Sequence, residues 1–196
     1  MAQTFLVTGV IIKRSNYREA DKWLTLITRE KGKIRVLAKG LRKLSSKRGG
    51  KLELFNLVRL QVAPGKAYLV AAEVETLETF PKFRQDLAKL SLVFTFAEIV
   101  DVLTAEEQVN VNSLGLLTNF LRQSESLSQT DLEELLTRSL GELLKNLGFW
   151  DGLYLQEKMT KLSFIESYVE TITEKRLRSS KALATSSPAF AKASAD

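Results

Sequence analysis

The sequence predicts an α+β protein, in which a five-stranded β-barrel precedes an all-α region. Apolar and polar residues alternate with a period of two before Phe80-Pro81, and apolar residues recur at helical spacing after it. The charge divides at the same place, because residues 1–82 carry a net charge of +10 and residues 83–196 carry −4. We therefore expect a nucleic-acid-binding barrel domain over 1–80, a helical domain over 81–180 and a disordered tail over 181–196.

The first two strands are predicted from apolar runs. Thr4–Ile12 is β-branched and apolar on both faces, which indicates a buried strand. A polar interval over 13–22 separates it from Trp23–Thr28, which alternates with Trp23, Thr25 and Ile27 on one side. The turn that follows, over 29–33, contains Gly32 and is typical of a β-hairpin.

The third strand has the most informative pattern. In Lys33–Lys39 the cations alternate with the apolar residues Ile34, Val36 and Ala38. Because successive side chains of a strand point to opposite faces, the cations should lie on one face of the sheet and the apolar residues on the other. A loop rich in Ser and Gly follows over 40–51.

Two more strands complete the barrel. Leu54–Val62 alternates, Pro64-Gly65 forms a turn, and Ala67–Leu77 continues the alternation, with Tyr68, Val70, Ala72 and Val74 expected on one face. Phe5, Phe55 and Tyr68 are expected in the core. Five strands and one long loop fit an open barrel of the oligonucleotide-binding (OB) type. An SH3-like barrel has a similar number of strands and remains an alternative.

Four helices are predicted beyond Phe80-Pro81. The first covers Phe83–Leu103 and is apolar enough to be buried on most sides, and the second is capped by Asn112 or Ser113. Capping boxes at Thr130–Glu133 and Ser163–Glu166 open the third and fourth, which are expected to end at Gly148 and near residue 179.

The composition argues against most enzyme classes. The chain has no Cys and no His, which removes thiolate nucleophiles, Cys/His zinc sites and Ser–His catalysis. The Gly-Lys pairs lack the rest of a phosphate-binding P-loop. We therefore expect a protein that is not an enzyme and holds neither metal nor cofactor. A magnesium-dependent nuclease with carboxylate ligands is the remaining alternative.

The cellular location is expected to be the cytoplasm, in association with the nucleoid. The sequence contains no apolar run long enough to span a membrane. The N-terminal residues lack the basic region and the cleavage site of a signal peptide.

Positive charge is concentrated in residues 29–51, where ten Lys or Arg residues and one acid give a net charge of +9. Lysines that guard a sheet edge would explain one such strand, but a larger excess repels itself unless a polyanion binds. Tyr17 either stacks on bases or packs on the surface, and Trp23 is expected in the core. The predicted DNA contacts are Arg14, Tyr17, Arg18, Lys33, Arg35, Lys39, Arg42, Lys43, Lys47, Arg48 and Lys51.

These motifs resemble the RecO family of bacterial recombination mediators. The resemblance rests on N-Y-R-E-A-D-K-W-L-T-L-I-T-R-E-K-G-K, V-L-A-K-G-L-R-K, S-K-R-G-G-K-L-E-L-F and F-P-K-F-R-Q-D-L, and extends more weakly to L-L-K-N-L-G-F. It implies an OB-fold that binds single- and double-stranded DNA, followed by a helical domain. It also implies annealing of complementary strands, RecA loading, and RecR and single-stranded-DNA-binding protein (SSB) as partners. The SSB C-terminal tail would bind the helical domain.

One departure from the family pattern is visible. Many relatives carry four cysteines in a zinc module after the L-G-F segment, and this chain has none. We interpret residues 150–162 as a short connection that replaces the module, which puts partner contacts through it in doubt. An RNA-binding OB module and a scaffold based on the helical half remain rival interpretations.

Overall fold

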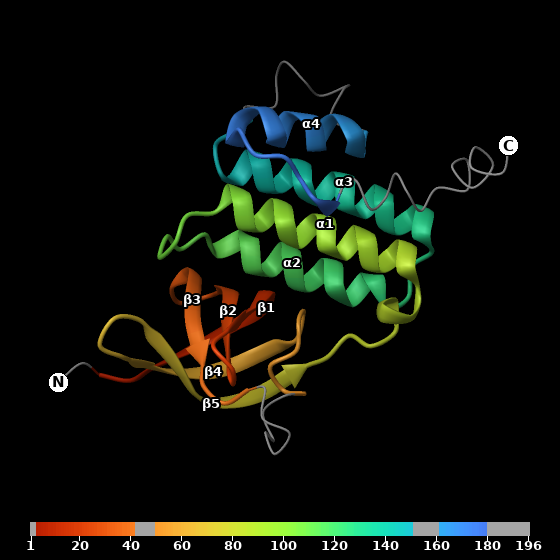
Figure 1. The fold of residues 1–196 in the computed structure, drawn as a ribbon. Coiled ribbons are helices and arrows are strands. Elements are labelled where there is room, and N and C mark those ends of the chain that lie inside the picture. The colour runs from red at the N-terminus through yellow and green to blue at the C-terminus, as the bar shows by residue number, and fades with distance from the viewer. Residues whose placement is uncertain (1–2, 42–49, 151–160, 180–196) are drawn as a thin grey trace, which may run out of the picture. The chain divides into compact units, whose positions relative to one another are not determined.

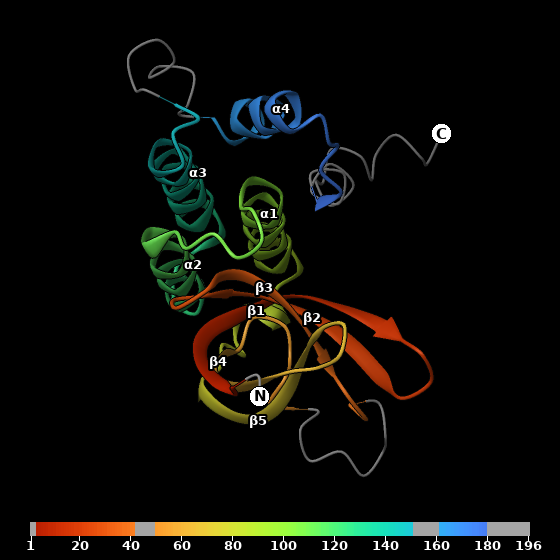
Figure 2. The same cartoon turned by 90° about the vertical axis from the view of Figure 1, so that its left-hand side faces the viewer.

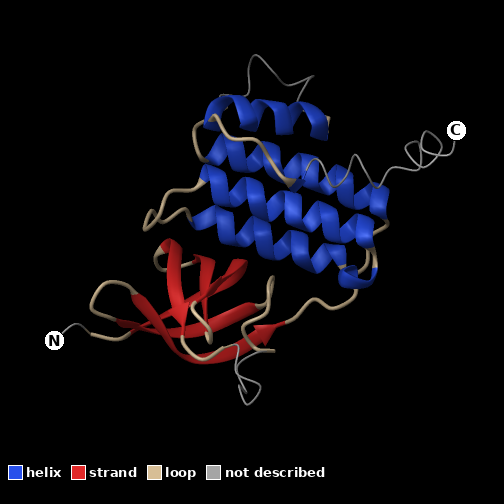
Figure 3. Ribbon diagram, in the orientation of Figure 1, coloured by secondary structure: helices blue, strands red, loops and turns tan. Residues whose placement is uncertain are grey.

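The computed structural model describes residues 3–41, 50–150 and 161–179 (Figure 1). The chain divides into two compact units, one formed by Met1–Phe80 with Thr104–Thr118 and the other by Pro81–Leu103 with Asn119–Asp196. In the described residues all strands belong to the first unit (Figure 3).

The first unit is a barrel of five strands, which confirms the predicted OB-type fold. The strands are β1 (Phe5–Tyr17), β2 (Asp21–Thr28), β3 (Gly32–Ala38), β4 (Leu57–Pro64) and β5 (Leu69–Glu78). Their order around the barrel is β1-β2-β3-β5-β4, and β4 pairs back with β1 (Figure 2). This order is the Greek-key arrangement of the OB-fold rather than a sequential meander.

The expected open barrel is wrong in one respect, because the sheet closes. Two residues of β3 pair in parallel with two of β5, Val36 with Leu69 and Leu37 with Val70. All other neighbouring strands are antiparallel. The barrel therefore lacks the gap that an open sheet would leave between β3 and β5.

The core of the barrel contains the apolar residues predicted for β3. Its buried members include Val7, Ile11, Leu24, Leu26, Ile34, Val36, Ala38, Val58, Leu60, Val62 and Ala71. Phe5 packs against this cluster, and Phe55 is fully buried, as expected. Leu41 and Leu52 also belong to it, so both described ends of the long β3–β4 loop are held by buried leucines.

Two expectations for the strands are wrong. Residues 13–17, expected as a polar interval, extend β1 and pair with β2 from Asp21 to Thr25. In β5 the expected face is wrong as well, because Ala71 is buried and Ala72 is exposed. The register between β4 and β5 shifts between Leu60 and Val62, and this irregularity reverses the phase of the alternation.

A short segment of the same unit extends the sheet beside β3. Glu107 donates its backbone N–H to the carbonyl oxygen of Lys33 at 2.8 Å. Gly32 lies beside this segment with φ +65°, and a Cβ there would be 1.9 Å from the Gln108 carbonyl oxygen. The hairpin turn therefore requires glycine at this position for both its conformation and its packing.

The second unit is helical. It contains the 3₁₀ turn η1 (Phe83–Gln85) and the helices α1 (Leu87–Leu103), α3 (Gln129–Asn146) and α4 (Leu162–Thr173), while the boundary between units passes through α2 (Val111–Ser124). Helix α1 packs against α3 and α4, and α3 packs against α4. Leu132, Leu136, Leu140 and Leu143 of α3 are fully buried and form its packed stripe.

The helix ends differ from the sequence expectations by a few residues. Asn110 caps α2, and Ser128 caps α3, where its hydroxyl accepts from the Asp131 backbone N–H at 3.2 Å. Gly148 follows α3 with φ +78°, which confirms the expected end of that helix. Helix α4 begins at Leu162 without a side-chain cap and ends at Thr173, so the capping box and the length predicted for the fourth helix are wrong.

The first helix is less buried than expected. It begins at Leu87, which is 72% exposed, rather than at Phe83, since residues 83–85 form a 3₁₀ turn and Asp86 accepts from the backbone N–H groups of Ala88 and Lys89. The buried face of α1 includes Leu92, Phe96, Ile99 and Leu103.

Candidate nucleic-acid interface

The candidate site is the outer face of β1, β2 and β3, which we define by the cross-strand pairs that point away from the core. One row across the sheet contains Lys13, Thr25 and Arg35, and the next contains Ser15, Trp23 and Leu37. Lys33 lies opposite Ile27 in a third row. The buried side chains Leu24, Leu26, Ile34 and Val36 alternate with these positions, so the outer face is fixed by the core itself.

The predicted separation of charge on β3 is present. Ile34, Val36 and Ala38 lie in the core, whereas Arg35 is exposed on the outer face. Lys33 is half-buried, and Lys39 is exposed immediately after the strand. Two members of this face are apolar and buried, namely Ile27 at 2% exposure and Leu37 at 1%, and the cross-strand neighbour of Leu37 is Trp23.

Three aromatic side chains meet on the outer face. The ring of Trp23 lies 5.4 Å from that of Tyr17, tilted by 58°, and 5.2 Å from that of Tyr68, at 81°. Tyr17 is at the end of β1, Trp23 is in β2, and Tyr68 immediately precedes β5. All three are half-buried. The expectations that Trp23 and Tyr68 lie in the core are therefore wrong.

Two arginines lie over these rings. The Arg35 guanidinium carbon is 4.4 Å from the centroid of Trp23, and that of Arg18 is 5.2 Å from the centroid of Tyr17. Both distances are within the range of cation–π attraction, which holds a guanidinium over an aromatic face. Arg18 has φ +52° in the turn between β1 and β2, which directs the chain back into β2.

The start of β2 is tied to the start of the loop over residues 40–51, which we call the basic loop. The Asp21 carboxylate accepts a hydrogen bond from the Gly40 backbone N–H at 2.7 Å. Gly40 has φ +67° and follows Lys39 directly. This bond places Lys39 beside the end of the hairpin that carries Tyr17 and Arg18.

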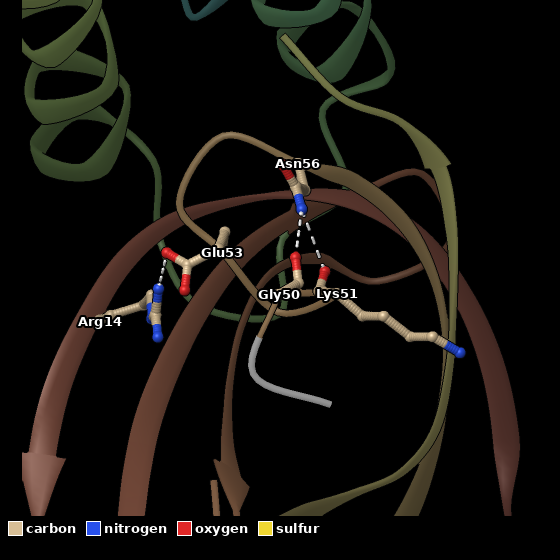
Figure 4. Close-up of polar contacts among 5 residues, drawn as sticks. All are labelled: Arg14, Gly50, Lys51, Glu53 and Asn56. Atoms are coloured by element: carbon tan, nitrogen blue, oxygen red, sulfur yellow. Dashed lines mark hydrogen bonds and ion pairs between the residues drawn. The ribbon is translucent and has the colours of Figure 1, made fainter. Parts of the chain in front are cut away.

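The other end of the basic loop is held by Asn56, which is only 3% exposed (Figure 4). Its side-chain amide donates to the carbonyl oxygens of Gly50 and Lys51 at 3.1 and 3.2 Å. Arg14 forms an ion pair with Glu53 in the same region. The described ends of the loop are therefore fixed by specific polar contacts. Lys51 is bound to Asn56 through its backbone carbonyl and is itself exposed.

The predicted contact residues separate into three groups. Tyr17, Arg18, Arg35, Lys33 and Lys39 lie on the outer face or at its edge. Arg14 lies opposite Leu24, on the inner side of the sheet, and pairs with Glu53, while Lys51 lies at the far end of the loop. Arg42, Lys43, Lys47 and Arg48 lie outside the described residues.

Sequence reasoning missed three residues of this face. Lys13 is exposed and shares a row with Thr25 and Arg35. It is separated from Tyr17 by four residues, so strand periodicity would have placed both on one face if 13–17 had been interpreted as a strand. Trp23 and Tyr68 gave no such signal, because apolar residues occupy both faces of their strands.

Two features are absent from the described residues. None of their Asp and Glu side chains gather in groups of three that could hold a metal ion. None of the helices traced in 3–41, 50–150 and 161–179 is long and apolar enough to cross a membrane.

The closed Greek-key barrel and the aromatic, cationic face of its second and third strands define an OB-fold protein. Residues 1–80 match the family described as "Recombination protein O N terminal". The chain is 33% identical over 153 residues to a "DNA repair protein RecO" of a Cyanothece species, covering 78% of this chain and 51% of that protein. It is 34% identical over 148 residues to that of Symbiobacterium thermophilum, covering 75% and 58%. The chain belongs to the RecO family.

The matched region covers only part of this chain and only part of each relative. In the protein of Acaryochloris marina the identity rises to 40%, over 99 residues that cover 50% of this chain and 34% of the relative. The chain spans about half the length of the curated relatives that it matches.

Proposed function

We propose that this protein is a DNA repair and homologous recombination mediator without enzymatic activity, which acts on DNA in the cytoplasm. It binds single- and double-stranded DNA, anneals complementary strands and assists RecA loading on SSB-coated single strands. The names of the similar proteins support a role in DNA repair. The observation that carries the proposal is the outer face, where cations and aromatic rings occupy the strands that OB-folds use for oligonucleotides.

The proposed mechanism is charge neutralisation. Lys13, Lys33 and Lys39 contact phosphates, and Arg18 and Arg35 add planar cations next to the rings. Two DNA strands repel each other through their phosphates, so a protein that neutralises both permits them to approach and pair. No nucleotide hydrolysis is required. Each neutralised phosphate contributes about −0.7 to the logarithmic salt dependence for a single strand.

The basic loop extends the proposed face. Arg42, Lys43, Lys47 and Arg48 are predicted to contribute phosphate contacts from the sequence alone. The anchors at Gly40 and at Gly50 and Lys51 support this role, because they fix where the loop leaves the barrel and where it returns. Arg14 is not part of the proposed face, since its guanidinium pairs with Glu53.

The proposed partners follow from membership of the family. They are RecR, RecA acting indirectly, and SSB, whose acidic C-terminal tail is expected to bind the helical unit. The basic residues Lys175, Arg176 and Arg178 follow α4, and the backbone N–H of Arg178 bonds to Glu98 at 3.0 Å. Lys181 of the same basic stretch lies outside the described residues.

Charge reversal tests the face. We expect Lys33→Glu with Lys39→Glu to weaken binding of single-stranded DNA at least tenfold and to leave the circular dichroism spectrum unchanged. The matched control is Arg59→Glu, which makes the same kind of charge change on β4, where Arg59 pairs with Glu75. Equal affinity of the double variant and the wild type would overturn the proposed face.

Annealing tests the mediator role. Complementary strands are coated with SSB that has or lacks its acidic tail, and the rate of pairing is measured with and without this protein. A rate that increases only when the tail is present supports both the DNA-binding face and the SSB contact. Tighter binding to RNA than to DNA of the same sequence, or degradation of DNA with added Mg²⁺, would overturn the proposal.

A further inference from the structure

Aromatic rings on the outside of a barrel need a reason, because the same side chains in the core would bury more apolar area. Tyr17, Trp23 and Tyr68 come from three different parts of the barrel and meet on its outer face. Their ring contacts are tilted and edge-on rather than parallel. The cluster is therefore a set of ring faces at different orientations, and it shares the surface with the cations of β1 and β3.

Trp23 differs from the two tyrosines because its ring contacts both of the other rings in the cluster. The Arg35 guanidinium lies over its ring at 4.4 Å, as that of Arg18 lies over the Tyr17 ring at 5.2 Å. Trp23 is thus placed to hold Arg35 in position, as a positioning residue. Tyr17 and Tyr68 each contact Trp23, from the end of β1 and from the residue before β5.

From this geometry we infer that Tyr17 and Tyr68 form a stacking site for unpaired bases, so that the outer face recognises single strands by a contact that duplex DNA does not make. The inference rests on the proposed function and names the substrate class of the same site. Lysines contact phosphates, which are present in both forms of DNA. Aromatic rings contact base faces, which in a duplex are already stacked on each other.

The size of the cluster sets the number of bases. The two ring contacts of 5.4 and 5.2 Å place Tyr17 and Tyr68 at most about 11 Å apart. Stacked nucleotides rise about 3.4 Å each along a strand. The site therefore accommodates at most about three nucleotides, with the guanidinium planes of Arg18 and Arg35 beside them as additional stacking surfaces.

The test separates bases from phosphates. Tyr17→Leu with Tyr68→Leu removes both rings and keeps apolar side chains. Anisotropy is measured at one salt concentration with three probes: an oligo-dT strand, an abasic strand of the same length and charge, and a duplex. The control Phe94→Leu changes a partly exposed aromatic residue of α1. We expect the double variant to bind oligo-dT about tenfold or more weakly. Its affinity for the abasic strand and for duplex should stay within about twofold of the wild type.

A second readout follows Trp23 directly. The chain has two tryptophans, so Trp150→Phe leaves Trp23 as the only indole. We expect oligo-dT to quench its fluorescence and the abasic strand to leave it nearly unchanged at equal saturation.

The outcomes are distinct. Equal losses for oligo-dT, abasic strand and duplex, or no loss for any of them, would overturn the stacking site and leave the proposed DNA-binding face intact. A wild-type protein that binds none of the three probes would overturn the proposed function, and the stacking site with it.

Discussion

Arg14 and Arg35 lie in adjacent rows of the same barrel wall and differ in what surrounds their charge. Arg35 stands on the outer face, opposite Thr25, with its guanidinium over the Trp23 ring. Arg14 stands opposite Leu24, has a side chain only 13% exposed, and pairs with Glu53. A charge on the outer face can meet a ligand, whereas a charge on the inner side needs a partner within the protein. We therefore expect substitutions on the inner side to lower mainly stability, and substitutions on the outer face to lower mainly DNA affinity.

The inner side should lose the most stability when it is changed. Leu26→Ala removes a fully buried side chain from the barrel core, and we expect the free energy of unfolding to fall by about 2–5 kcal/mol. Urea denaturation followed by circular dichroism measures this change. DNA affinity per folded molecule should remain within about twofold of the wild type. A large loss of affinity in the folded protein would show that the two faces are not separable.

Arg14 sharpens the comparison, because the sequence predicted it as a DNA contact. Arg14→Leu leaves the Glu53 carboxylate without its partner, so we expect a loss of about 2 kcal/mol in stability. The loss is smaller than for a fully buried pair, because the Glu53 side chain is 45% exposed. Glu53→Gln is the matched variant and should cost a similar amount. A tenfold loss of DNA affinity without a loss of stability would restore Arg14 to the interface.

The strand pattern shows where sequence was sufficient and where it was not. In β3 only one phase of the alternation is strongly apolar, so Ile34 and Val36 were assigned to the core correctly. In β2 both phases are apolar, with Trp23 and Ile27 in one and Leu24 and Leu26 in the other. Periodicity alone cannot choose between two such faces. The pairing with β3 decides, because Leu26 lies opposite Ile34.

Other parts of the site depend on contacts that local patterns do not contain. Tyr68 reaches Trp23 because the β4–β5 turn comes back beside β3, and the register shift in β4 and β5 was not visible in the sequence. The cap of α3 was predicted two residues too late, since Ser128 and Thr130 are both suitable capping residues. The fold class required only the change of period at residue 80 and was predicted correctly.

The helical unit contains a partly buried carboxylate, that of Glu166, which extends the comparison. Glu166 of α4 has one oxygen buried with no hydrogen-bond partner among the described residues. Burial, followed by repulsion from Glu170, Glu133 and Glu98, raises its pKa from 4.5 to about 7. Glu98 and Glu170 accept backbone hydrogen bonds from residues 177–179, so their negative charges are stabilised in place.

The pH dependence follows from the direction of this shift. Between about pH 4.5 and 7 the folded protein binds a proton at Glu166 that the unfolded chain releases, so stability falls as pH rises through this window and levels off above it. Because the side chain is partly exposed, we expect the loss to be about 1 kcal/mol. Thermal unfolding of Glu166→Gln should lack this fall. The control Glu142→Gln changes an exposed carboxylate of α3 and should retain it.

The smallest change in stability is expected on the outer face, at Arg35. Arg35→Gln removes one exposed cation–π contact, so the free energy of unfolding should fall by no more than about 1 kcal/mol. Its effect on binding should be larger, because it removes both a charge and the planar group that Trp23 holds in place. Isothermal titration with oligo-dT measures the affinity, and Arg35→Lys distinguishes the two contributions. Lysine keeps the charge but lacks the guanidinium plane, so an affinity restored by Arg35→Lys would assign Arg35 to phosphate contact alone. Persistent loss in that variant would assign the contribution to the guanidinium on Trp23.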